Sequence, residues 1–215
     1  MKKQDKVNAV ITVLEKQYPD AKCSLEYKKP YELLFATVLS AQCTDKRVNV
    51  VTKELYAKYP TLEGIANATS EEIGECIKSC GLYKTKAKNI VASAKILIEK
   101  YNSELPSSIE ELTTLPGVGR KTANLIMGDI FHQPAVVTDT HCIRICNRLG
   151  FTKNTEPYNV EKDLKKILPP DKSSDFCHRL VLFGREFCSA RNPKCDKCPI
   201  KLEYKNEIKC IIKTN

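Results

Sequence analysis

Apolar residues recur at helical spacing along most of the 215-residue chain, and this pattern limits the fold more than any other feature. Val7, Val10 and Leu14 lie on the first such stripe, and another follows Pro30, a residue suited to the first turn of a helix. The alternating pattern of a half-buried strand is almost absent. A chain of this length can bury a substantial core, so we expect an all-α protein that folds unaided.

Several later segments have the same helical period. Thr69 and Glu72 form a capping-box pair at the start of one stripe, and Gly81 would end it. A short apolar run from Ala135 to Val137 follows Pro134, the best late breakpoint, and leads into a new helix. No repeat or long linker marks a domain boundary. Helices are expected over 84–101, 108–115, 121–130, 141–149, 158–168 and 174–187.

Charge and cysteine content limit the class of protein. The formal net charge of +9 favours a polyanionic partner, with nucleic acid the first candidate. The opening MKKQDKVNAVITVLEK mixes charges throughout, unlike a signal peptide or a membrane span, so we expect a soluble intracellular protein without a membrane partner. Most of the eleven cysteines lie in helical apolar stripes, which predicts reduced thiols and not a secreted disulfide scaffold.

The segment LPGVGRKTAN, residues 115–124, predicts a phosphate-binding turn. Gly117 and Gly119 permit a tight connection between two helices, and the N-terminus of the second helix attracts anions. Such a hairpin holds a nucleic-acid backbone without reading its bases. Lys121 has two interpretations: it contacts phosphate as a cation, or it is a nucleophile, because a helix N-terminus and Arg120 both weaken its hold on a proton.

Asp139 is the candidate carboxylate for proton transfer to and from such an amine. It lies in VVTDTHCIRICNRLG directly before a helix, where an ordinary N-cap would contribute about 1 kcal/mol. The helix behind it has two different faces. The apolar face is expected to join the core: Cys142, Ile145, Cys146 and Leu149. The basic face is expected to meet solvent or DNA: His141, Arg144 and Arg148.

The chain resembles the endonuclease III family of DNA glycosylases, in its helix-hairpin-helix branch, over nearly its whole length. The matching segments, in the family's order, are LLFATVLSAQCTDKRVN, GLYKTKAKNI, LPGVGRKTAN, DTHCIRICNR, LVLFGREFC and NPKCDKCP. The resemblance implies a six-helix barrel module over residues 22–133, with the hairpin at about 108–128. It also implies a second helical module over 1–21 and 134–215 that carries an iron–sulfur cluster, with DNA in the groove between the modules.

This resemblance implies a bifunctional DNA glycosylase and AP lyase of base excision repair. Its partner would be double-stranded DNA with damaged bases or abasic sites, and oxidised pyrimidines would be removed. At matching positions Lys121 would attack C1′ of an extruded nucleotide and Asp139 would assist, followed by β-elimination through a Schiff base. Gln42 and Leu82 match the family's elements that fill the space left by the extruded base. The alternative is that they are an ordinary polar residue at a helix end and an exposed loop leucine. The expected DNA contacts are Gln42, Leu82, Gly117, Gly119, Arg120, His141 and Arg144.

Two alternatives belong to other classes. An adenine-specific glycosylase would use water as its nucleophile, and Lys121 and the short segment after the cysteines argue against it. A non-catalytic DNA-binding module would use the hairpin only for backbone contact. No local motif sets the preferred lesion. We expect a monomer, and the lack of an N-terminal extension favours a prokaryotic cytoplasm.

The C-terminal cysteines depart from the family pattern of four cysteines with gaps of six, two and five residues. Cys188, Cys195 and Cys198 satisfy the first two gaps, but Tyr204 stands at the fourth position. A 4Fe-4S cluster normally takes four thiolates, and we expect Cys210 to replace the missing one. An unusual ligand at one iron, a zinc site formed by the same thiols, and loss of the metal are the alternatives.

Overall fold

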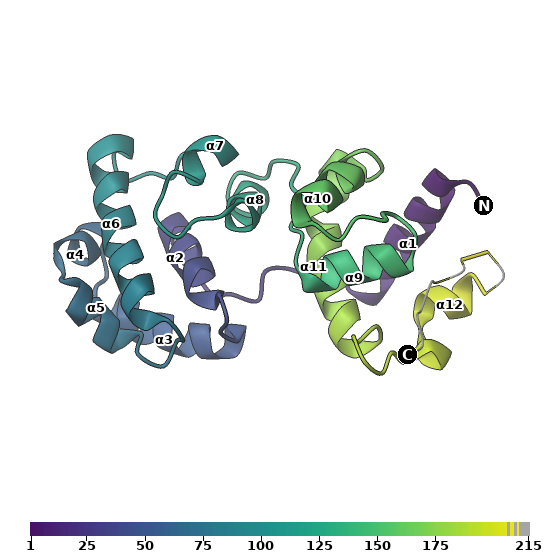
Figure 1. The fold of residues 1–215 in the computed structure, drawn as a ribbon, viewed down its shortest axis with the longest axis horizontal. Coiled ribbons are helices and arrows are strands. Elements are labelled where there is room, and N and C mark those ends of the chain that lie inside the picture. The colour runs from purple at the N-terminus through teal and green to yellow at the C-terminus, as the bar shows by residue number, and fades with distance from the viewer. Residues whose placement is uncertain (206, 209, 211–215) are drawn as a thin grey trace. The chain divides into compact units, whose positions relative to one another are not determined.

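The computed structural model describes residues 1–205, 207, 208 and 210, and every regular element in them is a helix (Figure 1). The all-α prediction is therefore confirmed. In chain order the helices are α1 (Lys3–Gln17), α2 (Pro30–Ser40), α3 (Asp45–Lys58), α4 (Leu62–Asn67), α5 (Ser70–Cys76), α6 (Tyr83–Tyr101), α7 (Ile109–Leu112), α8 (Arg120–Asp129), α9 (Thr140–Arg148), α10 (Pro157–Lys165), η1 (Pro170–Lys172), α11 (Ser173–Glu186), η2 (Cys195–Lys197) and α12 (Pro199–Glu203).

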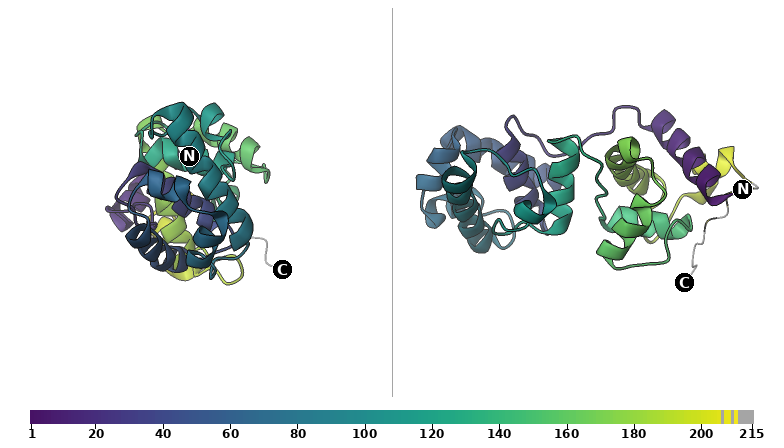
Figure 2. Two further views of the ribbon diagram at one scale, coloured as in Figure 1. Left: turned by 90° about the vertical axis from the view of Figure 1, so that its left-hand side faces the viewer. Right: turned by 90° about the horizontal axis from the view of Figure 1, so that it is seen from above.

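The helices form two compact units (Figures 1 and 2). We call Cys23–Phe131, which contains α2 to α8, the hairpin unit. Met1–Lys22 and His132–Asn215 together make the second unit, which contains α1 and α9 to α12, and we call it the cysteine unit. The resemblance implied 22–133 for the first module and 1–21 with 134–215 for the second. None of the described helices is long and apolar enough to cross a membrane.

The core of the hairpin unit is built around α2, a helix that is apolar on all sides. Its Leu33, Leu34 and Phe35 are fully buried, as expected for a helix enclosed by others. α3 and α6 pack against α2, and α4 and α5 pack against α6. Buried Glu32 closes the start of α2 by accepting hydrogen bonds from the Lys28 and Lys29 amides at 2.7 and 3.2 Å.

The helix ends in this unit show where the apolar periodicity of the sequence did not predict the helix bounds correctly. The Thr69–Glu72 capping box is confirmed, with both reciprocal hydrogen bonds present. However, α5 ends at Cys76 and not near Gly81. The chain continues there as a turn, in which the Cys80 amide donates a hydrogen bond to the Ile77 carbonyl. The helix expected over 108–115 is only Ile109–Leu112. The periodicity did not single out α3, α4 or α12.

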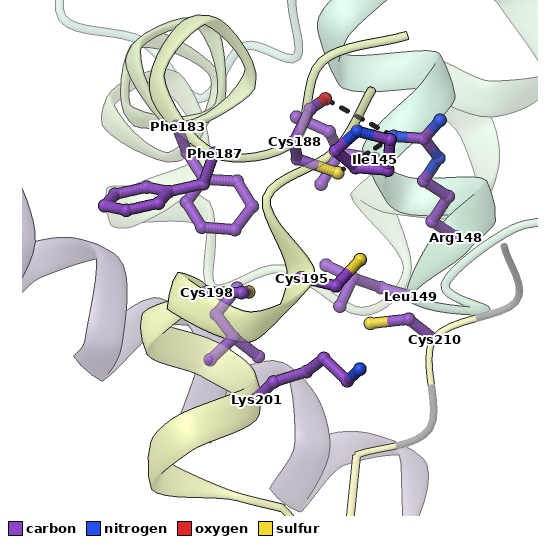
Figure 3. Close-up of a pocket in the computed structure, with 12 residues that line it drawn as sticks. Ile145, Arg148, Leu149, Phe183, Phe187, Cys188, Cys195, Cys198, Lys201 and Cys210 are labelled. Carbon is purple, nitrogen blue, oxygen red and sulfur yellow. Dashed lines mark hydrogen bonds between the residues drawn. The ribbon is translucent and has the colours of Figure 1, made fainter. Parts of the chain in front are cut away.

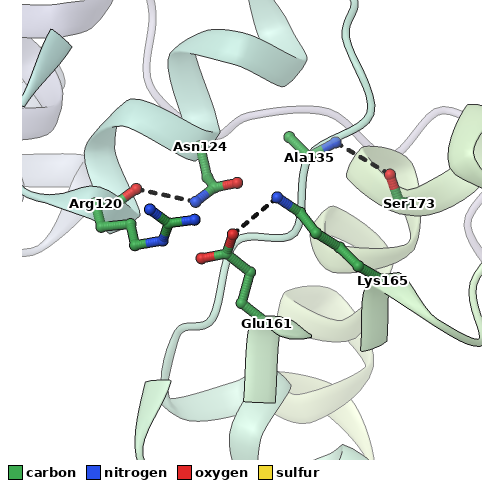
Figure 4. Close-up of polar contacts among 6 residues, drawn as sticks. All are labelled: Arg120, Asn124, Ala135, Glu161, Lys165 and Ser173. Atoms are coloured by element: carbon green, nitrogen blue, oxygen red, sulfur yellow. Dashed lines mark hydrogen bonds and ion pairs between the residues drawn. The ribbon is translucent and has the colours of Figure 1, made fainter. Parts of the chain in front are cut away.

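The cysteine unit joins segments from distant parts of the chain. α1 packs against α11 and α12 through a buried apolar face that includes Val7, Val10 and Leu14. α9 packs so closely against α11 that a side chain at Gly184 would overlap the His141 ring. α10 carries a buried carboxylate, Glu161, which forms an ion pair with Lys165 at 2.8 Å (Figure 4).

Candidate functional site

The turn between α7 and α8 is tight because of one glycine. Gly117 has a φ of 80°, a conformation that favours glycine, and a Cβ there would lie 2.7 Å from Nδ2 of Asn89, so this side chain would have to shift. The Pro116 carbonyl accepts a hydrogen bond from the Ser93 hydroxyl at 3.1 Å, and Val118 is buried. The predicted tight hairpin is present, and these contacts fix it to the core of its unit.

The N-terminus of α8 is open. Gly119 is the N-cap, no described side chain caps the first turn there, and a Cβ on Gly119 would meet nothing within 4 Å. Arg120 and Lys121 are exposed in this first turn. Asn124 donates to the Arg120 carbonyl at 3.1 Å, a contact inside the helix (Figure 4). The arrangement offers backbone amides, the positive end of a helix dipole and two cationic side chains to an anion.

Asp139 lies at the start of α9, after a buried extended run. The run is anchored where the Ala135 amide donates to the Ser173 hydroxyl at 3.1 Å (Figure 4). Asp139 is partly buried, and its Oδ1 accepts a hydrogen bond from the Cys142 amide at 2.7 Å. The predicted N-cap is confirmed. The helix behind it buries Cys142, Ile145 and the rest of the apolar face that the sequence predicts.

Gln42 and Leu82 occupy two adjacent loops of the hairpin unit. Both have left-handed backbones, with φ of 57° and 59°, a conformation that costs a non-glycine residue about 1–3 kcal/mol and is concentrated at functional sites. Leu82 is 62% exposed although it is a large apolar side chain. Buried Lys86 joins the loops, because its ammonium donates to the carbonyls of Leu39 and Ala41 at 2.9 and 2.7 Å. The sequence did not single out Lys86.

The basic face of α9 makes contacts within the protein that the sequence did not predict. Arg144 donates to the Cys188 carbonyl at 3.2 and 3.0 Å. Arg148 donates to the carbonyls of Ser189 and Ala190 at 2.7 and 2.9 Å, and to Sγ of Cys188 at 3.2 Å. This partly exposed face therefore holds the backbone that follows α11, and its contact with DNA stays a prediction. Helical periodicity identifies a polar face but not which loop covers it.

One cavity of the cysteine unit brings four cysteines together. Its wall includes Cys188, Cys195, Cys198 and Cys210, and Figure 3 shows their side chains around it. Much of the remaining wall is apolar: Ile145, Leu149, Phe183, Phe187, Pro193 and Ile200. Arg148 and Lys201 add positive charge. Thiols from three separate segments therefore face the same space, although only Cys195 and Cys198 are close in sequence.

Cys210 reaches this cavity because the chain reverses at Tyr204. The Tyr204 carbonyl accepts hydrogen bonds from the amides of Glu207 and Ile208 at 3.1 and 3.0 Å, and the Ile208 side chain is buried. Tyr204, which occupies the usual position of the fourth ligand, does not line the cavity. Cys210 therefore lies beside the other three cysteines, as its predicted role as a ligand requires.

The donor set fits an iron–sulfur cluster, because four thiols line a largely apolar cavity whose wall also includes the cationic side chains of Arg148 and Lys201. Burial raises the pKa of Cys198, and it raises the pKa of Cys210 to about 11, with further contributions from the nearby cysteines. Binding a positive metal centre would oppose this rise by stabilising the thiolates. Within the described residues, no three His, Cys, Asp or Glu side chains form a group suited to a single metal ion.

Comparisons with known proteins agree with this arrangement of elements. The model of the HhH-GPD superfamily of base excision DNA repair proteins matches residues 35–170. The endonuclease III of Synechocystis is 44% identical over 199 residues, which cover 92% of this chain and 91% of that protein. The endonuclease III of Bacillus subtilis is 45% identical over 184 residues, covering 85% and 84%.

A solved structure, described as a trapped endonuclease III–DNA covalent intermediate, has a TM-score of 0.89 at 42% identity and covers 98% of this chain and 97% of its own. The chain belongs to the endonuclease III family. It is therefore a helix-hairpin-helix DNA glycosylase of base excision repair, and an enzyme. The resemblance inferred from the sequence is confirmed.

Proposed function

We propose that this protein is a bifunctional DNA glycosylase and AP lyase that removes oxidised pyrimidines from double-stranded DNA and cleaves abasic sites. The observation that carries the proposal is the placement of Lys121, an exposed amine in the first turn of α8 beside an open anion site. A phosphate bound there would hold the sugar of its own nucleotide near the amine. The relative trapped as a covalent intermediate with DNA supports a covalent mechanism.

In this mechanism the neutral amine of Lys121 attacks C1′ of the extruded nucleotide, and the bond from C1′ to the base breaks as the base leaves with its electron pair. The sugar ring opens to give a protonated Schiff base between C1′ and Nζ. This group acidifies the proton on C2′, whose removal expels the 3′ phosphate by β-elimination. Water then hydrolyses the imine and releases Lys121.

Asp139 assists these proton transfers or stabilises the developing positive charge. Its Oδ1 is held by the Cys142 amide, so the carboxylate has a fixed orientation. Oδ2 is the oxygen we assign to the reaction. A fixed carboxylate needs less reorganisation as charge develops than a mobile one.

DNA contacts complete the proposal. Gly117, Gly119 and Arg120 hold the backbone at the hairpin, while the left-handed loops present Gln42 and Leu82 to the space left by the extruded base. His141 and Arg144 stay predicted phosphate contacts. Arg144 already uses Nε and Nη2 to hold the Cys188 carbonyl, so its removal would also disturb that loop.

Lys121→Arg is the variant that tests the nucleophile. A guanidinium keeps the positive charge but cannot form a Schiff base at neutral pH. We expect borohydride to trap wild type on abasic duplex DNA and not to trap this variant, with similar affinity for uncleaved DNA. Arg120→Gln is the matched control, since it removes the neighbouring charge but should still be trapped. Trapping of Lys121→Arg at the wild-type yield would identify a different amine.

The same assay separates the alternatives. An adenine-specific glycosylase would release adenine but form no trapped complex. A non-catalytic module would bind DNA but neither release a base nor form a trapped complex. A panel of duplexes that each contain one oxidised pyrimidine would identify the preferred lesion. We further propose that the protein acts as a monomer in a bacterial cytoplasm, and sedimentation with and without DNA would test its oligomeric state.

We also propose that Cys188, Cys195, Cys198 and Cys210 hold a 4Fe-4S cluster. When bound, the cluster would supply iron–thiolate bonds that cross-link the three segments around the cavity. Iron and sulfide analysis of anaerobically purified protein, together with the visible spectrum, would distinguish a cluster from zinc and from no metal. Cys210→Ser should lose iron, whereas Tyr204→Phe should retain it. The reverse result would assign the fourth ligand to Tyr204.

A further inference from the structure

Two cysteines of the hairpin unit are in contact, one in each of the loops that carry Gln42 and Leu82. The sulfur atoms of Cys43 and Cys80 are 3.8 Å apart. Cys43 directly follows Gln42, and Cys80 precedes Leu82 by two positions. Both are free thiols, and neither has a role in the mechanism or the metal site proposed above.

The surrounding structure already holds these loops together. Lys86 ties the start of α6 to the end of α2 through two carbonyls, and a Cβ on Gly81 would lie 3.9 Å from the Gln42 carbonyl oxygen. A disulfide has a sulfur–sulfur bond of about 2.05 Å, so the two sulfur atoms need to approach by about 1.8 Å. Small side-chain rotations and a limited movement of the loops can supply this distance.

The two thiols differ in access to an oxidant. Cys43 is partly buried, whereas Cys80 is fully buried. Burial, followed by the hydrogen bond with Cys43, raises the pKa of Cys80 to about 11. Because Cys43 is the more accessible of the two sulfur atoms, it meets the oxidant first, and Cys80 is the one that resolves the product.

We propose that Cys43 and Cys80 form a reversible redox modification site, in which a disulfide fixes the two loops and slows the reaction of the protein with DNA. A low-molecular-weight disulfide is the oxidant. The Cys43 thiolate attacks one of its sulfur atoms and expels a thiolate, and Cys80, losing its proton, then attacks the Cys43 sulfur and expels the second. The two protein thiols are oxidised, the small disulfide is reduced to two thiols, and the two protons end on them.

The effect on activity rests on the proposed function, in which Gln42 and Leu82 enter the DNA. Both residues have left-handed backbones, so small changes in the flanking residues change where their side chains point. A bond between Cys43 and Cys80 would pull on both loops at once and shift the residues that flank Gln42 and Leu82. In a reducing compartment such a disulfide is transient and reports oxidation, which suits a redox-sensing role.

Peptide mapping tests whether the bond forms. Trypsin releases residues 29–46 and 79–84 as separate peptides with one cysteine each, so a linked pair identifies Cys43–Cys80 without ambiguity. We expect the linked pair after incubation with glutathione disulfide and blocking of free thiols, and its loss after reduction with dithiothreitol. This readout does not depend on activity. Absence of the linked pair when other thiols have been oxidised would overturn the proposal.

Strand cleavage of abasic DNA tests the consequence. We expect oxidised wild type to cleave about tenfold more slowly than reduced wild type, a loss typical of displaced positioning groups, and to recover on reduction. Cys43→Ala and Cys80→Ala should escape this loss, whereas Cys76→Ala, a partly buried cysteine on α5, should behave as wild type. Linked protein that cleaves at the reduced rate, or equal losses in all variants, would overturn the proposal. Reduced wild type that fails to cleave would instead contradict the proposed function.

Discussion

Helices α8 and α9 begin in different ways. The first turn of α8 follows Gly119 and has no described side-chain cap, whereas the first turn of α9 is closed by Oδ1 of Asp139, 2.7 Å from the Cys142 amide. An open helix N-terminus can bind an anion from another molecule. A closed one is already occupied by a carboxylate of the same chain. The difference teaches that one motif, a helix start, can bind a ligand in one place and orient a carboxylate in another.

The largest effect expected from this comparison is at Asp139. Asp139→Asn should lower turnover by about 10³-fold, because an amide cannot transfer the proton, while it still caps α9. Asp139→Ala should lose similar activity and also about 1 kcal/mol of unfolding free energy. Single-turnover cleavage and urea unfolding of both variants would measure the two effects separately. Wild-type turnover in Asp139→Asn would show that the cap is the whole role of this residue.

The next effect concerns the turn that places the open N-terminus. Gly117→Ala should destabilise the protein by about 2 kcal/mol, because alanine resists the left-handed backbone and its Cβ would overlap Asn89. Gly119→Ala is the matched control, since its φ is −94° and its Cβ would meet open space. Thermal unfolding of the two variants should show a clear difference. Equal losses would mean that the turn does not depend on the conformation of Gly117.

Closing the open N-terminus should weaken DNA binding without unfolding the helix. Gly119→Asp places a carboxylate where we expect a phosphate, and a loss of about 1 kcal/mol corresponds to roughly fivefold weaker binding to undamaged duplex. Stability should rise by a few tenths of a kcal/mol, since aspartate caps better than glycine. Gly119→Asn separates capping from charge, because it offers a neutral cap. Unchanged affinity in both variants would remove this helix start from the DNA contact.

The last effect is a pH dependence that belongs to neither helix start. The folded protein raises the pKa of Cys80 to about 11, so it favours the neutral thiol more than the unfolded chain does. This contribution to stability is complete below about pH 9 and is lost as the pH rises through 11. Urea unfolding between pH 8 and 11 should show a smaller decline for Cys80→Ala than for wild type. The difference between Asp139→Asn and Asp139→Ala should stay constant over the same range.

Local signals in the sequence predicted much of the fold. The Thr69–Glu72 capping box and the Asp139 cap involve neighbours within one turn, so residue types and spacing were sufficient to find them. The end of α7 was placed too late, because Thr113 and Thr114 turn their hydroxyls back to the carbonyls of Glu110 and Glu111, an alternative to helix continuation that periodicity does not detect.

Contacts between distant segments were the part that the sequence did not reveal. The link from Arg148 to the Cys188 loop spans about forty positions, and the contact between Cys43 and Cys80 spans almost as many. Neither residue type nor spacing identifies such partners, because they depend on how whole helices pack. The position of Cys210 was predicted only because the family pattern left one thiol missing.

The cysteine unit is interrupted in the sequence, since the hairpin unit lies between its two segments. During synthesis on the ribosome the hairpin unit is complete once Phe131 has emerged, whereas α1 has to wait for α11 and α12 before its apolar face can be covered. The order of translation therefore leaves Val7, Val10 and Leu14 without their native partners for most of the time that the chain is growing. In a nascent chain this first helix is the segment that molecular chaperones would protect longest.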